Sequence, residues 1–273
     1  MSTTTASTIP SWQRHLRAQG SSAVATIAAV LSILAVWQVA VVVGNRVPSP
    51  TQSIDRLVSE AAIGELWHNL AISMNRFLLG LVLALVVGTA IGVLMGQSKL
   101  ADLALSDLNA AALAIPAVIW ALLTTMWFGF GWLTSVVTVF LSGVPFVVVN
   151  IAKATRAVPA DLVLMSRAFG VPRAKVLRHI VAPAVAGSTV AAVRFAIMSA
   201  WNGLLLAEWF GATSGVGWRS RYWYDANQLD GFFAWVLVFI LLLVFADLLI
   251  LGPIERYVSR WRTAQQPLRT RKK

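Results

Sequence analysis

Six long apolar segments alternate with polar, mostly basic connections along the chain. A helix needs about 20 apolar residues to cross a hydrocarbon core about 30 Å thick. The pattern therefore predicts an all-α integral membrane protein with six transmembrane helices. They are expected at residues 23–43, 74–95, 110–127, 133–149, 184–206 and 232–251.

The first and third segments have features that bear on whether each one forms a membrane span. The first is 21 residues long and no convincing cleavage site follows it, so we expect a retained helix rather than a signal peptide. The third contains Pro116, which removes a backbone donor. Neighbouring helices and water can satisfy the backbone groups that a proline frees in a membrane bundle. We therefore expect residues 110–127 to form one span.

Basic residues are distributed unevenly over the connections. With the N-terminus placed in the cytoplasm, the cytoplasmic segments carry sixteen Lys and Arg residues and the external ones four. Such a bias predicts that both termini are cytoplasmic. The chain is then divided into a cytoplasmic segment at 1–22, a transmembrane domain at 23–252 and a basic cytoplasmic tail at 253–273. The longest polar connection, 153–183, lies in the cytoplasm between the fourth and fifth helices.

Composition narrows the possible functions. Hydrophobic residues make up 58% of the chain and charged residues only 12%, unlike a soluble domain. The net charge of +11 lies between the apolar segments, so we expect a lipid environment and no nucleic-acid partner. Cysteine is absent, the three histidines lack metal-ligand spacing, and no phosphate-binding loop motif occurs. We therefore expect a non-catalytic chain that holds no metal.

Small residues recur every four positions in the second segment. Such a spacing places them on one face of a helix, where a second helix backbone can approach closely. We predict that this stripe packs against protein rather than lipid. Its members are Gly80, Ala84, Gly88, Gly92 and Gly96.

Four charged residues lie within or at the ends of the segments. A charge at the bilayer centre costs about 2.5–3.5 kcal/mol on insertion scales, so it should face protein or water. Arg76 and Glu208 both fall on the outer side and could pair as a structural staple. Arg194 lies deeper, and could pair with Asp247 or present its charge to an anion in a transport path.

The 153–183 connection predicts ordered structure. Residues 161–169 suit a short helix, and Gly170 suits the left-handed position after it. Pro172 suits the start of a second helix, which Pro183 is expected to end before the membrane. The short helix would present an apolar face to a cytoplasmic partner: Leu162, Met165, Ala168 and Phe169.

Three stretches in order resemble one known family. Gly170 is followed thirteen residues later by Pro183, the stretch 115–120 (IPAVIW) continues to 127–131 (WFGFG), and Ala207-Glu208 precedes Gly215-Val-Gly217. Together they are similar to the inner-membrane permeases of ABC importers, in the nitrate/sulfonate/taurine branch. The Glu-Ala-Ala triplet of that family is replaced by Leu164, Met165 and Ser166.

The resemblance implies a role for the chain. It would be the permease subunit of an ATP-binding-cassette importer in the bacterial cytoplasmic membrane, moving a small solute such as nitrate, a sulfonate or taurine, or bicarbonate. ATP and Mg would lie on a separate ABC ATPase dimer, and this chain would hold no cofactor. A second permease copy or a homologous permease and an extracytoplasmic binding protein would complete the importer.

The charges within the segments and the resemblance together give the candidate site residues. The proposed translocation path or intramembrane charges are Arg76, Trp120, Arg194 and Glu208. The proposed ATPase-coupling residues are Leu164, Met165, Ser166, Arg167, Ala168, Phe169, Gly170, Pro172 and Pro183.

Two other functions remain open at this point. An ion-coupled secondary transporter would need titratable carboxylates near the midplane, whereas Asp247 lies near the inner end. A membrane scaffold without a path would explain the apolar segments but not the Gly170–Pro183 pattern.

Overall fold

The computed structural model describes residues 28–29, 31–44 and 47–246. In this part of the chain all regular structure is helical. The helices are Leu31–Val43, α2 (Pro50–Ala62), α3 (Glu65–Gln97), α4 (Lys99–Ala114), α5 (Ala117–Phe128), α6 (Trp132–Arg156), α7 (Ala160–Ala168), α8 (Arg173–Val176), the π-helical turn η1 (Leu177–Val181), α9 (Ala182–Gly211), α10 (Val216–Asp225) and α11 (Leu229–Phe245).

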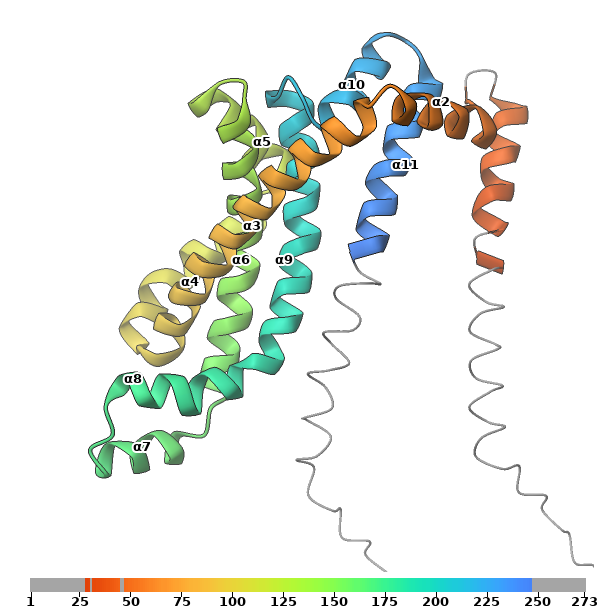
Figure 1. Cartoon of the computed structure of the whole chain (residues 1–273). Coiled ribbons are helices and arrows are strands. Elements are labelled where there is room, and N and C mark those ends of the chain that lie inside the picture. Colours follow the sequence, from red (N-terminus) through yellow and green to blue (C-terminus); the bar gives the residue numbers. More distant parts are fainter. Residues whose placement is uncertain (1–27, 30, 45–46, 247–273) are drawn as a thin grey trace, which may run out of the picture.

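Helices α3, α6 and α9 form the centre of the bundle (Figure 1). Their shared core includes the buried side chains of Val139, Ile151, Trp201 and Leu204. Trp201 also stacks on Phe239 of α11, with ring centroids 5.2 Å apart. Apolar burial of this kind stabilises the packing of α6 and α9 against α3 and α11.

The small-residue stripe of α3 faces α6. A Cβ built on Gly80 would lie 2.6 Å from Val139, and one on Gly88 would lie 2.7 Å from Val147. Gly92 meets Ile151 and Gly96 meets Thr155 in the same register. Each partner lies the same number of positions further along the chain, so α3 and α6 run parallel. The four-residue spacing thus aligns two helices at backbone contact.

The third predicted span is wrong as one helix. The chain breaks between α4 and α5, whose axes are bent by 98°. Ile115 and Pro116 are both extended, at ψ 118° and 146°. A proline disfavours the helical conformation of the residue before it, and this local effect overrides the continuous apolar run. The helix expected to begin at residue 110 also begins earlier, at Lys99.

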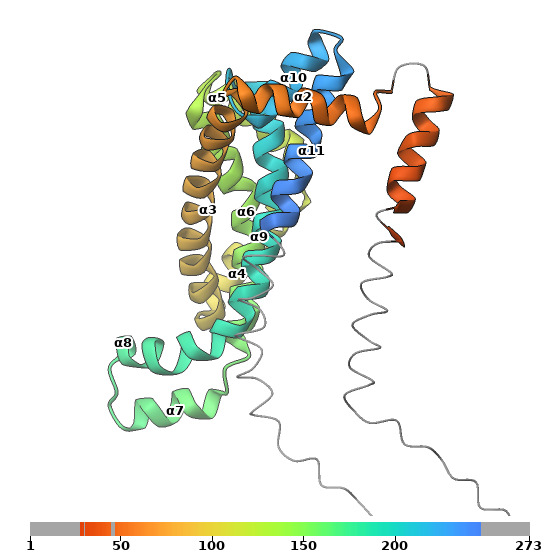
Figure 2. The same cartoon turned by 45° about the vertical axis from the view of Figure 1, so that its right-hand side comes forward.

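The two ends of the bundle differ in character (Figures 1 and 2). Helices α2 and α10 and the turn between α5 and α6 lie at one end, called the α10 end below. Helices α7 and α8 lie side by side at the opposite end, called the α7 end, in both views. The three connections that the predicted topology makes external therefore share one end, and the 153–183 connection, predicted to be cytoplasmic, lies at the other.

Two described helices, α3 and α6, are long and apolar enough to cross a membrane, and the bent pair α4–α5 counts as a third if it is one span. Helices also occupy the other predicted segments, although residues 23–27, 30 and 247–251 lie outside the described part. The count of six spans and the cytoplasmic position of the termini remain predictions.

Candidate functional site

Arg76 and Glu208 meet in a buried ion pair at the α10 end. Arg76 Nη1 lies 2.9 Å from Glu208 Oε1, and the two side chains are 4% and 0% exposed. This is the pairing predicted from their positions on the outer side. A buried pair is tolerated only when further hydrogen bonds satisfy its remaining polar atoms.

Glu208 receives those further hydrogen bonds. Ser73 Oγ lies 2.8 Å from both carboxylate oxygens, and the backbone N–H of Gly217 donates to Oε2 at 2.9 Å. Arg76 in turn donates to the carbonyl oxygen of Ser214 at 2.7 Å and to its hydroxyl at 2.8 Å. We call this set, with Asn69, the polar junction.

The polar junction holds the loop between α9 and α10. Asn69 accepts from the N–H of Gly215 at 2.8 Å, and Ser73 accepts from the N–H of Val216 at 2.8 Å. Gly215 has φ +106°, and a Cβ there would collide with the Glu208 carboxylate. A Cβ on Gly217 would lie 2.6 Å from the Leu205 carbonyl oxygen. Both glycines of the Gly-Val-Gly stretch are thus required by close approach to α9.

A second buried carboxylate lies nearby, on α2. Glu60 is 2% exposed and accepts from Arg219 Nε at 2.9 Å, Arg219 Nη2 at 3.0 Å and Trp235 Nε1 at 3.2 Å. Burial by itself would lower the pKa of Arg219, but its hydrogen bond and attraction to Glu60 outweigh this and raise the pKa above the ordinary value. Arg219 therefore stays charged and joins α10 to α2.

The predicted turn at Gly170 between two short helices, called the elbow below, is present at the α7 end. Gly170 follows α7 with φ +66°, and the N–H of Val171 donates to the carbonyl oxygen of Ser166 at 2.9 Å. This bond and the left-handed glycine form the helix-ending arrangement known as the Schellman motif. Pro172 directly precedes α8. The Gly170 and Pro172 positions follow from local backbone chemistry, as the sequence predicted.

Three apolar side chains in α7 or directly after it have little cover in the described part of the chain. The side chain of Leu162, also predicted for this face, lies outside the described residues. Leu164 is 59% exposed, Met165 54% and Phe169 80%. Ser166, between them in sequence, is buried. Such an exposed apolar face is typical of a protein-interaction surface.

Pro183 does not end the second helix, contrary to the prediction. The chain is helical from α8 through η1 into α9, and Pro183 lies in the first turn of α9. The N–H of Ala182 donates to Leu177, five residues back, in a widened π turn. This widening redirects the backbone bonds just before the residue that lacks an N–H, so the helix continues. The connection is also shorter than predicted, because residues 153–156 belong to α6.

The other two predicted path residues do not join the polar junction. Trp120 is half-buried on α5, one turn after the break at Pro116. Arg194 is half-buried on α9 and interacts with another group of the protein. Its expected partner Asp247 lies outside the described residues.

Several polar residues of this region were not predicted from the sequence. Asn69, Ser73 and Arg76 follow the i, i+4, i+7 spacing of one helix face, which was a usable signal. The pairing of Glu60 with Arg219 had no such signal, because the two residues are 159 positions apart.

The chain is similar to known transport proteins. Over 238 residues it is 27% identical to a permease protein of Bacillus subtilis (strain 168) named for aliphatic sulfonates transport, covering 86% of each chain. It is 24% identical to the taurine transport system permease protein of Escherichia coli (strain K12), covering 92% of this chain and 93% of that one.

A solved structure has the same fold. A chain of the MetNI methionine ABC transporter in inward-facing conformations superposes with a TM-score of 0.57 at 17% identity. The match covers 76% of this chain and 96% of that one.

A family model matches residues 68–251, which include the polar junction, the elbow and the parallel helices α3 and α6. Its description is "Binding-protein-dependent transport system inner membrane component". The chain therefore belongs to this family, the inner-membrane permeases of ABC importers.

Proposed function

We propose that this chain forms half of the translocation path for a small anion and is driven by a separate ATPase subunit bound at the α7 end. The cargo would be nitrate, a sulfonate such as taurine, or bicarbonate. The relatives named for sulfonates and taurine favour this class. A second permease, identical or homologous, would supply the other half of the path.

The observation that carries this proposal is the arrangement of the α7 end. A short helix with exposed Leu164, Met165 and Phe169 ends at a left-handed glycine and turns back into the helical segment that becomes α9. The segment from Arg173 to Gly211 is helical without interruption. A push on α7 would therefore reach the polar junction through α9, which carries Glu208.

The α10 end is proposed to receive cargo from outside the cell. Its polar junction and the Glu60–Arg219 pair tie α2, α3, α9 and α10 together at the end away from α7. An extracytoplasmic binding protein would deliver cargo there. In this orientation α7 faces the cytoplasm, as the basic residues of its connection require.

The test is capture of the ATPase. The chain would be expressed with its operon neighbours, purified in detergent through a tag, and assayed for a co-purifying ATPase subunit. Phe169→Glu should lose that subunit, because a charge would enter an apolar docking face. Phe130→Glu is the matched control, since Phe130 is 69% exposed at the other end.

Retention of the ATPase by Phe169→Glu would contradict docking at α7. If the unaltered chain captures no ATPase at all, the driven-importer assignment fails. Uptake by reconstituted vesicles, tested with nitrate, taurine and bicarbonate in turn, would then identify the cargo.

A further inference from the structure

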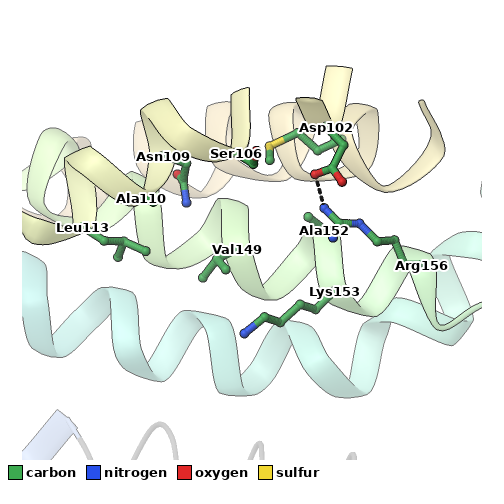
Figure 3. A pocket seen from close by; sticks show the side chains of 10 residues that line it. Asp102, Ser106, Asn109, Ala110, Leu113, Val149, Ala152, Lys153 and Arg156 are labelled. Carbon is green, nitrogen blue, oxygen red and sulfur yellow. Dashed lines mark hydrogen bonds and ion pairs between the residues drawn. The ribbon is translucent and has the colours of Figure 1, made fainter. Parts of the chain in front are cut away.

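A cavity of about 190 Å³ lies between α4 and α6 in the half of the bundle toward α7 (Figure 3). Its charged groups gather at one end, where Asp102 on the first turns of α4 meets Arg156, the last residue of α6. Its opposite end is lined by Ala110, Leu113 and Val149. Figure 3 shows Asp102 and Arg156 at one side of the view and Leu113 at the other.

The charged end carries an excess positive charge. Arg156 donates to the Asp102 carboxylate, so these two charges offset each other. Lys153 lines the same cavity, and its ammonium group makes no hydrogen bond or ion pair with any residue that the structure describes. The three groups together have a net charge of +1.

Between the two ends lie groups of intermediate polarity. Ser106 and Asn109 project from α4, and the Asn109 amide donates to the carbonyl oxygen of Pro145 at 3.3 Å. The lining thus combines charged, polar and apolar side chains. A small aqueous anion needs polar groups on all sides, whereas an amphiphile matches a lining that has both charged and apolar groups.

Helix α4 lies at the edge of this chain. It has no buried residue, and Leu100, Leu103 and Leu108 are 79%, 70% and 66% exposed. Exposed leucines along a helix at the edge of an apolar bundle are typical of lipid contact. In this chain, the cavity therefore borders a helix whose outer face is apolar.

We propose that this cavity binds an anionic phospholipid of the inner leaflet, with its phosphate on Lys153 and Arg156 and an acyl chain against Leu113 and Val149. The placement in the inner leaflet rests on the proposed orientation, in which α7 is cytoplasmic. Basic pockets between transmembrane helices on the cytoplasmic side are suited to acidic headgroups. Asp102 orients Arg156 and limits the affinity, because its carboxylate repels the phosphate.

Native mass spectrometry tests the proposal on the full chain, purified with its co-purifying subunits. Phosphatidylglycerol, phosphatidylcholine and inorganic phosphate are added separately. Lys153→Gln should weaken phosphatidylglycerol binding about fivefold, since one basic residue near a membrane surface contributes about 1 kcal/mol. Asp102→Asn should strengthen it, which a purely structural role for Asp102 does not predict. Lys99→Gln is the matched control, outside the cavity lining and also at the start of α4.

Several results would overturn the proposal. An equal change in affinity for Lys153→Gln and Lys99→Gln would leave only general surface attraction. Inorganic phosphate that displaces the lipid at millimolar concentration would identify a free-anion site instead. A Ser106→Cys variant that cross-links to a second copy would show that protein covers the cavity. None of these readouts needs ATP or transport, so they are independent of the proposed function.

Discussion

Arg76 and Glu208 are 132 positions apart in sequence, and their side chains form a 2.9 Å ion pair with almost no solvent exposure. Removing both charges from water is costly, and the hydrogen bonds from Ser73 and Gly217 help to offset that cost. The pair joins α3 to α9 and also holds the loop that leads to α10. Its main effect is to determine how three elements meet at the α10 end.

Replacing Glu208 by Ala should lower the free energy of unfolding by about 3–5 kcal/mol, because the Arg76 charge is left buried without its partner. Unfolding by sodium dodecyl sulfate in mixed micelles measures this. The double variant Arg76→Ala with Glu208→Ala should lose less than the two single losses added together. Additive losses would show that the two residues act independently.

Replacing Glu60 by Ala should loosen α2. Arg219 and Trp235 would lose their shared acceptor in a buried site, at a cost of about 3–5 kcal/mol. Hydrogen exchange of the α2 amides should rise more than that of α6. Asp55→Asn is the control, because Asp55 is exposed on the same helix. Equal exchange in both variants would contradict a specific role for Glu60.

Replacing Gly88 by Ala should separate α3 from α6. The added Cβ would lie 2.7 Å from that of Val147, and overpacking of this kind costs about 1–3 kcal/mol. Adding Val147→Gly should restore part of the loss in thermal stability, because it removes both the Cβ and the methyl group that the added Cβ would meet. Ala90→Val, on the exposed side of α3, should change little. A lack of rescue would argue against direct contact at this position.

Replacing Gly170 by Ala should reduce ATP-driven uptake while the protein still folds. The left-handed conformation costs about 1–2 kcal/mol for an ordinary residue, and no atom lies within 4 Å of the added Cβ, so the effect is on backbone conformation alone. Gly170→Asn should retain more uptake, because Asn tolerates this conformation better. Uptake and ATPase rates are measured in the same vesicles. Unchanged uptake in Gly170→Ala would remove the elbow from the coupling role.

Local rules predicted much of the helical structure. The spacing of Gly80 to Gly96 predicted a packed face, and Gly170 predicted a helix end, because both effects depend on residues within a few positions of each other. The same rules failed at Pro116 and at Pro183. One proline broke a predicted span and the other lies in a continuous helix, and the difference depends on whether the backbone there bends or widens.

The sequence by itself determined that the chain is a bundle of apolar helices with a basic, ordered connection, since hydrophobic length and charge bias are properties of short segments. The tertiary structure alone decided that Glu60 meets Arg219, that Ser73 and Gly217 complete the Glu208 site, and that a cavity forms between α4 and α6. These contacts depend on which helix faces meet. Many pairings of similar apolar helices satisfy the same local pattern, and only the packed bundle selects one of them.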